Sequence, residues 1–336
     1  MDVRLRALGA WVAASILNSD EPLHPSTFSP VSDDASFRRY FRCTAVPKPM
    51  VFMDAPPDKE PLAQFLSVTE QLRNAAQPVP EIFAFDERLG FLALSDFGDQ
   101  KLFDVFSVGS AKPQVLLPSL LLQLDALARV ECDVPTYSKT MLAAELELFP
   151  EWYLQRLLNI QLDDEFWSVW RPLCAFLIDS AVCQPQVFVH RDFHSRNIMM
   201  RPSARLGLLD YQDAVLGPLT YDLVSLLKDC YWRFDRGLVV SQVAAFFDVW
   251  HSHPNLRAMD RLGFLRVFDL MGLQRHLKCA GIFARLSLRD GKARYLNDIP
   301  LVMDYIFEVC SEQDECSAFF HWLKQYVEPL LKVSPG

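Results

Sequence analysis

The chain has 336 residues, of which 51% are hydrophobic and 22% are charged, so it has enough apolar material for two modest domains or one two-lobed domain. Its net charge of −9 disfavours a nucleic-acid partner held through phosphate contacts. The sequence contains no apolar run near the roughly 18–20 residues needed to span a bilayer, so we expect no membrane association.

The first 20 residues read MDVRLRALGAWVAASILNSD and place apolar residues at about helical spacing, with Arg4 and Arg6 between them. No small-residue cleavage site follows, so we expect an amphipathic helix that packs on the body of the protein rather than a signal peptide. The eight cysteines form no Cys-x-x-Cys pair. This pattern predicts reduced, buried thiols in a cytoplasmic protein, which we expect to be a monomer, and disfavours a zinc site.

Short strand-like runs bounded by Pro, Gly or Asp follow between residues 36 and 95: SFRRYFRCTA, PMVFMDA, EIFAFDE and GFLALSD. Between the second and third lies LAQFLSVTEQLRNA, which has the apolar spacing of one helix. Residues 1–95 are therefore predicted to form a small lobe with an antiparallel sheet, one helix on it and the leading helix. Residues 96–336 are predicted to form a larger, mainly helical lobe, because long 3.6-periodic segments follow Gly98, including SLLLQLDALARV, AAELELFPEWYLQRLL and DEFWSVWRPLCAFLIDSAV.

One stretch interrupts the helical pattern. Residues 186–200 read QVFVHRDFHSRNIMM, in which seven polar or charged residues crowd into the eight positions 190–197. A second strand-like run, RLGLLDY, follows at 205–211 and carries Asp210 near its end. Two hairpin-linked strands would bring the side chains of Asp192, Asn197 and Asp210 to one place.

Those three side chains offer the chemistry of phosphoryl transfer from ATP. Carboxylate and amide oxygens suit a hard cation such as Mg²⁺, and a carboxylate beside it can accept a proton from a substrate hydroxyl. The alternative is that Asp192 and Asn197 are ordinary turn residues and Asp210 caps the end of a strand.

The spacing H-x-D-x-x-x-x-N in VHRDFHSRNIMM, followed by LGLLDYQD, resembles the aminoglycoside phosphotransferase and choline kinase family, which is similar to protein kinases in fold. The resemblance implies a bilobal α+β fold that uses ATP and Mg²⁺. It implies that Asp192 is the base, that Asn197 and Asp210 hold Mg²⁺, that His190 braces the loop, and that Asp222 caps the loop from the next helix.

Further stretches resemble bacterial kinases that phosphorylate the anomeric C1 hydroxyl of N-acetylmuramate or N-acetylglucosamine in cell-wall sugar recycling. These stretches span residues from about 33 to about 300: DDASFRRYFR, MDAPPDKE, YQDAVLGPLTYDLVSLLKDCY and GLQRHLKCAGIFARLSLRDGKARYLNDIP. The resemblance implies an amino-sugar substrate. Two alternatives stay open: another small-molecule kinase of this superfamily, acting on an aminoglycoside, choline or homoserine, or a non-catalytic scaffold with the same fold.

The nucleotide side departs from the family pattern. The phosphate loop is expected near SDDASFRRYF, which has no glycine, although the small residues Ser32, Ala35 and Ser36 would let backbone N–H groups approach phosphates. Met53 and Asp54 stand where the phosphate-pairing lysine is expected. The candidates for a replacement cation are Arg38, Arg39, Arg42 and Lys59.

The motif Asp96-Phe97-Gly98 precedes the polar loop, whereas the metal-binding strand must follow it, so we interpret LALSDFGD as the last strand of the small lobe running into the hinge. The resemblance implies that the backbone of Leu94 and Asp96 meets the adenine there.

The sugar is expected beside Asp192. Polar residues near it in sequence that could contact the sugar are Arg196, Gln212 and Asp213. Arg275 and His276, with Lys278, lie in an otherwise apolar helix, and such basic groups suit the lactyl carboxylate of N-acetylmuramate. The alternative is a basic helix face that extends into water.

Overall fold

A computed structural model describes residues 2–32, 37–202 and 205–331 of the chain. The chain divides into two compact units, one formed by Met1–Lys101 with Ile198–Gln212 and the other by Leu102–Asn197 with Asp213–Gly336. The first unit contains the whole predicted small lobe. It also contains residues 96–101 and 198–212, which the sequence had assigned to the helical lobe.

The first unit is built on an antiparallel sheet with the strand order β1-β2-β3-β5-β4. Its strands are β1 (Phe28–Ser32), β2 (Arg39–Cys43), β3 (Met50–Asp54), β4 (Ile82–Asp86) and β5 (Phe91–Ser95). The four predicted strands are confirmed as β2 to β5, and β1 was missed. Its sequence FSPVS contains Pro30, which argues against a central strand but is tolerated here because β1 lies at an edge of the sheet.

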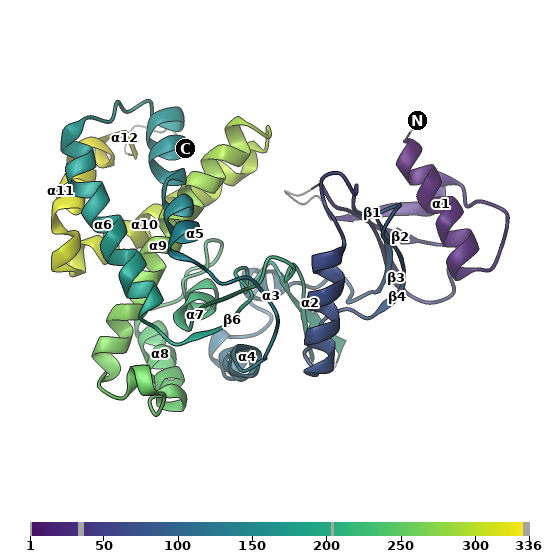
Figure 1. Cartoon of the computed structure of the whole chain (residues 1–336), viewed down its shortest axis with the longest axis horizontal. Helices are drawn as coiled ribbons and strands as arrows, with labels where there is room; N and C mark the ends of the chain where they lie inside the picture. The colour runs from purple at the N-terminus through teal and green to yellow at the C-terminus, as the bar shows by residue number, and fades with distance from the viewer. Residues whose placement is uncertain (1, 33–36, 203–204, 332–336) are drawn as a thin grey trace. The chain divides into compact units, whose positions relative to one another are not determined.

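Helices cover both faces of this sheet (Figure 1). The predicted leading helix is confirmed as α1 (Val3–Ile16), which is followed by the short 3₁₀ turn η1 (Pro25–Thr27). The apolar face of α1 packs on the sheet in a cluster that includes Leu8, Trp11, Val12, Phe28, Phe41, Phe52 and Phe91. The predicted second helix is α2 (Ala63–Asn74), on the other side of the sheet (Figure 1).

A hairpin from much later in the chain completes the first unit. It consists of β7 (Ile198–Arg201) and β8 (Arg205–Leu208), which pair in antiparallel fashion. The N–H of Met200 donates to the carbonyl of Gln100 at 2.8 Å, and the N–H of Leu208 donates to the carbonyl of Pro78 at 2.8 Å. These bonds fix both strands of the hairpin to the first unit.

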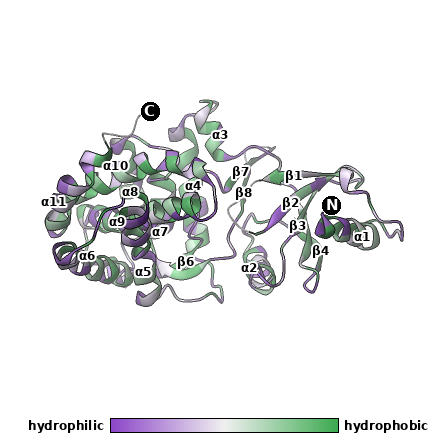
Figure 2. Cartoon of the chain, turned by 90° about the horizontal axis from the view of Figure 1, so that it is seen from above, coloured by the Kyte–Doolittle hydropathy of each residue, from purple (hydrophilic) through white to green (hydrophobic). Residues whose placement is uncertain are grey.

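The second unit is mainly helical. Its helices are α3 (Leu102–Ser107), α4 (Pro113–Ala128), α5 (Lys139–Leu146), α6 (Asp164–Val182), α7 (Thr220–Leu227), α8 (Arg236–Trp250), α9 (Arg261–Leu288), α10 (Ile299–Glu312), α11 (Ser317–Tyr326) and α12 (Glu328–Leu331). Shorter turns are the π-helical η2 (Phe149–Leu157) and the 3₁₀ segments η4 (Pro254–Leu256), η5 (Ala293–Asp298) and η6 (Asp314–Cys316). The long α9 packs against α10, η2, α7, α6 and α8. These helices mix hydrophobic and hydrophilic residues along their lengths, as expected of helices around a core (Figure 2).

Strand pairing around the polar loop differs from the expected hairpin. The strand before the loop, β6 (Gln186–Val189), pairs with β9 (Val215–Pro218) in the second unit. The strand predicted at 205–211 is β8, and it pairs with β7 instead. The sequence had suggested that β6 and β8 pair with each other. Instead, β6 pairs with β9 and β8 pairs with β7, so the polar loop connects two different small sheets.

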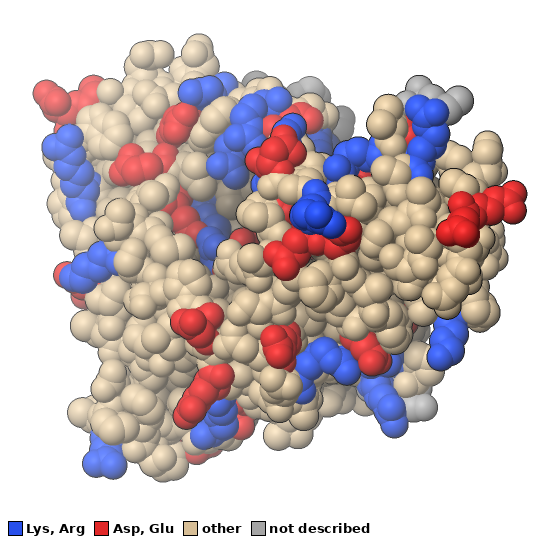
Figure 3. All heavy atoms as spheres, turned by 45° about the vertical axis from the view of Figure 1, so that its right-hand side comes forward, with Lys and Arg blue, Asp and Glu red and all other residues tan. Residues whose placement is uncertain are grey.

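Basic and acidic side chains are interspersed on the face drawn in Figure 3. Among the described residues, no helix combines the length and the apolar character needed to cross a bilayer.

We expect Gly90→Ala to lower the free energy of unfolding by roughly 2–5 kcal/mol, since it combines a left-handed residue with a backbone collision. Gly90 has φ +74°, and a Cβ there would lie 1.8 Å from the carbonyl oxygen of Ala55. Gly109 also has a positive φ, at +64°, but a Cβ there meets no atom within 4 Å. Gly109→Ala is therefore the control, with an expected loss of about 1–2 kcal/mol in chemical denaturation. Equal losses in the two variants would contradict the role of the Ala55 carbonyl.

Candidate functional site

The polar loop between β6 and β7 is anchored at its start by the carboxylate of Asp222, in the first turn of α7. Asp222 Oδ2 accepts the backbone N–H of His190 at 2.6 Å, and Oδ1 accepts that of Arg191 at 3.0 Å. Burial raises the pKa of Asp222 to about 7, although the two N–H groups act in the opposite direction. One buried side chain thus fixes two consecutive residues directly before Asp192.

Arg191 adopts a left-handed backbone with φ +74°, which is rare for a residue with a side chain. Its guanidinium forms an ion pair with Glu145 of α5 and lies 5.5 Å from the ring centre of Tyr137. Glu145 also binds Lys278 of α9, with 3.1 Å between Nζ and Oε1. The unusual backbone at Arg191 is therefore held by a half-buried ion cluster as well as by Asp222.

A second carboxylate holds the loop on the far side of Asp192. Asp229, two residues after α7, accepts the N–H of Ser195 at 2.8 Å through Oδ2 and that of Tyr231 at 2.9 Å through Oδ1. Sequence reasoning missed Asp229. The signal was available in YDLVSLLKD, where a second aspartate follows Asp222 by seven residues, or two helical turns.

Asn197 closes the loop from inside. Its Nδ2 donates to the backbone carbonyl of Asp192 at 3.2 Å, and its own N–H donates to the carbonyl of His194 at 3.0 Å. Because the amide nitrogen serves the loop, the amide oxygen is the atom of this side chain that suits a hard cation.

The Asp192 side chain is 42% exposed, and its Oδ1 lies 4.0 Å from Nε2 of His194. Burial opposes ionisation, but nearby positive groups, led by His194, Lys278 and Arg275, hold the pKa of Asp192 below its usual value. Burial also lowers the pKa of His194, while the carboxylates of Asp229 and Asp192 act in the opposite direction. Asp192 is therefore an ionised, accessible carboxylate near neutral pH.

Asp210 lies in the first unit, just after β8. It also has a left-handed backbone, with φ +64°, and its exposed carboxylate accepts Nε2 of Gln212 at 2.8 Å. The next residue, Tyr211, is buried, stacks on Phe65 of α2 with 5.5 Å between ring centres, and places its hydroxyl 2.9 Å from Oγ1 of Thr69. Tyr211 thus anchors the segment that presents Asp210.

The donor types fit Mg²⁺, because Asn197 offers an amide oxygen and Asp210 an exposed carboxylate. Asn197 belongs to the second unit and Asp210 to the first, so their convergence on one cation with Asp192 stays a prediction. Within residues 2–32, 37–202 and 205–331, no three His, Cys, Asp or Glu side chains gather as a metal site.

The residues expected at the nucleotide lie in the first unit. Ser32 ends β1, and Ala35 and Ser36 fall outside the described residues. Arg39 is bound to Asp2 and Asp54, and Leu94 is buried in β5. The predicted contact of adenine with the backbone of Leu94 stays a prediction.

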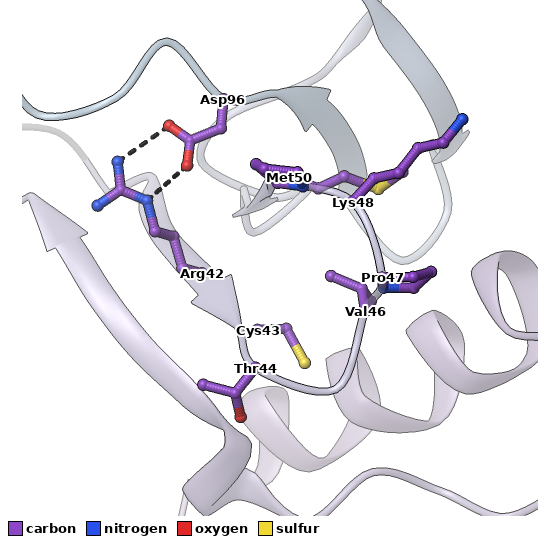
Figure 4. Close-up of a pocket in the computed structure, with 9 residues that line it drawn as sticks. Arg42, Cys43, Thr44, Val46, Pro47, Lys48, Met50 and Asp96 are labelled. Atoms are coloured by element: carbon purple, nitrogen blue, oxygen red, sulfur yellow. Dashed lines mark hydrogen bonds and ion pairs between the residues drawn. The ribbon is translucent and has the colours of Figure 1, made fainter.

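Asp96 receives two hydrogen bonds from Arg42 of β2, from Nε at 2.6 Å and from Nη2 at 2.9 Å (Figure 4). Together with the turn between β2 and β3, these side chains line a hollow in the first unit (Figure 4). The remaining lining residues are Cys43, Thr44, Val46, Pro47, Lys48, Pro49 and Met50. The Asp96 side chain is thus bound within the first unit, and the predicted contact of its backbone with adenine stays a prediction.

Of the residues expected at the sugar, Arg196 lies in the polar loop. Its guanidinium stacks 3.6 Å from the ring centre of Tyr231 and lies 3.5 Å from the Asp298 carboxylate. Gln212 is buried beside Asp210, and the carbonyl of Asp213 accepts a hydrogen bond from Arg191 at 3.4 Å.

The basic residues of α9 are buried rather than presented on a helix face. Arg275 is 2% exposed and donates to the sulfur of Cys230 at 3.1 Å. His276 is fully buried, with Nε2 2.9 Å from the carbonyl of Lys228 and its ring stacked on Tyr305. The reading of this segment as a helix face that extends into water is therefore wrong. Sugar contacts by these two residues stay predictions without geometric support.

Comparison with known proteins places these features in a family. Residues 27–265 match the phosphotransferase enzyme family. The chain is 39% identical over 323 residues to an N-acetylmuramate/N-acetylglucosamine kinase of Pseudomonas aeruginosa, with 94% of each chain covered. It is 38% identical over 329 residues to the kinase of the same name in Pseudomonas putida, again with 94% of each chain covered.

The fold is shared with solved structures at much lower identity. An ADP-bound aminoglycoside phosphotransferase matches with a TM-score of 0.56 at 14% identity, over 84% of this chain and 93% of the other. At this identity the likeness concerns the fold.

We expect Asp222→Asn to lower the free energy of unfolding by about 1–3 kcal/mol, because an amide offers one acceptor oxygen to two buried N–H groups. Chemical denaturation measures the loss. Asp304→Asn is the control, since Asp304 is 71% exposed and lies 3.9 Å from Arg233. The anchoring role of Asp222 is wrong if the two variants are equally stable.

Proposed function

This chain belongs to the phosphotransferase enzyme family, and on that premise we propose that it transfers the γ-phosphoryl group of ATP to the anomeric C1 hydroxyl of N-acetylmuramate or N-acetylglucosamine. The observation that carries the proposal is the likeness to kinases of that name, which extends over 94% of the chain at 39% identity. The loop around Asp192 supplies chemistry that fits the reaction.

Asp192 is the proposed base. A carboxylate that is ionised and accessible can accept the proton of the C1 hydroxyl as the oxygen attacks phosphorus. The flanking carboxylates of Asp222 and Asp229 fix the backbone on both sides, which keeps this acceptor in one position.

Asn197 and Asp210 are the proposed holders of Mg²⁺. When bound, the ion neutralises the charge of the ATP phosphates. The contribution of the chain is to hold the Asn197 amide through the Asp192 carbonyl and to hold the Asp210 segment through Tyr211.

Arg196 is the residue we propose for the lactyl carboxylate of N-acetylmuramate. Its side chain is 34% exposed, whereas Arg275 and His276 are buried in the core. Stacking on Tyr231 holds the guanidinium plane, and a planar fork suits a carboxylate.

We propose a cytoplasmic monomer. All eight cysteines are free thiols, which agrees with a reducing compartment in which ATP is available. The expectation that they are buried holds for five of them, whereas Cys183 is exposed and Cys132 and Cys174 are half-buried.

Phosphorus NMR of the product from ATP plus N-acetylmuramate or N-acetylglucosamine tests the function. We expect a sugar C1 phosphate, whose phosphorus signal is split by coupling to the anomeric proton. The same assay with aminoglycosides, choline and homoserine tests other kinase activities. A C6 phosphate, turnover of only those other acceptors, or no turnover of any acceptor would overturn the proposal.

Asp192→Asn should lower kcat by roughly 10²–10⁴-fold, because the amide cannot accept the proton, while ATP affinity and thermal stability stay near those of the wild type. Steady-state kinetics and calorimetric titration with ATP measure the two effects. Asp179→Asn, which alters a 65% exposed carboxylate of the same unit, is the control. Wild-type turnover in Asp192→Asn would remove the base assignment.

A further inference from the structure

We infer that Arg38, held by Glu60, is the cation that binds the ATP phosphates in place of the lysine missing from β3. The inference rests on the proposed use of ATP. It concerns the first unit alone, where the position of each candidate cation decides between them.

Neither β3 residue at the expected lysine position can supply this charge. Met53 is fully buried and pairs across the sheet with Tyr40. Asp54 is also fully buried and binds both Arg39 and Arg4, the latter on α1. A cation for the phosphates must therefore come from another element.

Arg39 and Arg42 are each bound to two carboxylates. Arg39 binds Asp2 and Asp54, and its guanidinium lies 5.5 Å from the ring centre of Phe41, whose ring belongs to the cluster under α1. Arg39 is thus on the α1 side of the sheet. Arg42 binds Asp96 through two nitrogens and also pairs with Asp99.

Arg38 lies on the side of α2. Its Nη2 is 2.8 Å from Oε2 of Glu60, three residues before α2, and the two side chains are only 10% and 17% exposed. The N–H of Phe37 also reaches Oε1 of Glu60, at 3.4 Å. Glu60 therefore holds both the backbone before Arg38 and the guanidinium itself in a half-buried position.

The same helix leads to the proposed metal ligand. Phe65 and Thr69 of α2 contact Tyr211, which follows Asp210. The segment from Glu60 through α2 thus binds Arg38 through Glu60 and, a few residues later, contacts Tyr211 beside Asp210. Both proposed contacts with the phosphates, one through the guanidinium and one through Mg²⁺, belong to this side of the first unit.

The chemistry of arginine suits the role. A guanidinium has five N–H donors in a plane, so one group can serve a carboxylate and a phosphate at once. Arg38 also directly precedes β2. Lys59 is the weaker candidate, because it is exposed and lies over the exposed ring of Phe37, 4.3 Å from its centre.

Calorimetric titration of the full chain with ATP, ADP and adenosine tests the inference. In Arg38→Gln we expect ATP and ADP to bind roughly 10- to 100-fold more weakly, with adenosine affinity within about twofold of the wild type. Arg38→Lys should recover part of the loss, since it restores the charge without the fork. Glu60→Gln should weaken ATP binding less than Arg38→Gln, because it loosens the guanidinium without removing it.

Arg73→Gln is the matched control, because Arg73 lies on α2 and its side chain is 42% exposed, 3.9 Å from Glu81. Thermal denaturation of each variant verifies folding, and Arg38→Lys serves if Arg38→Gln does not fold. Unchanged ATP affinity in Arg38→Gln, or an equal loss of adenosine affinity, would overturn the assignment of Arg38. The proposed function would still stand in that case if the wild-type protein phosphorylates the sugar. A wild type that binds no ATP would overturn both.

Discussion

The polar loop depends on one interaction, the acceptance of two consecutive backbone N–H groups by the buried carboxylate of Asp222. A loop that leaves β6 and enters a different small sheet has no ladder to satisfy its amides. Asp222 supplies acceptors before Asp192, and Asp229 supplies another after it. Because both carboxylates come from α7 or the residues just after it, the geometry of the loop follows the packing of that one helix against α9.

The electrostatic environment of this loop is set largely by the half-buried ion cluster of Arg191, Glu145 and Lys278. Glu145 lies between Arg191 and Lys278, and these two cations, together with His194 and Arg275, lower the pKa of Asp192. Positive charge outweighs the burial of the carboxylate, so Asp192 stays ionised. Buried ion pairs cost much solvation, which indicates that their value here lies in fixing positions and charge states rather than in stability.

The sequence predicted the secondary structure best where local patterns of apolar and turn residues determine it. Alternation and turn residues predicted β2 to β5, and helical periodicity predicted α1, α2 and α6. Sequence patterns did not predict features that depend on residues far apart in the chain. The sequence indicated β6 and β8, but each pairs with a four-residue strand, β9 or β7, that no pattern predicted. The basic residues of α9 were expected at the sugar, with a helix face extending into water as the alternative. Instead, Arg275 and His276 are buried, and Cys230 and the Lys228 carbonyl accept their hydrogen bonds.

The anchoring of the loop by aspartates has a consequence for its motion. The amides of His190, Arg191 and Ser195 donate to carboxylates that are almost entirely buried. Amide protons held in this way exchange with water only when the surrounding structure opens. In deuterium labelling, these three positions would behave like the interior of a helix, although no regular secondary structure contains them. Turnover would then need no ordering of this segment when substrate arrives.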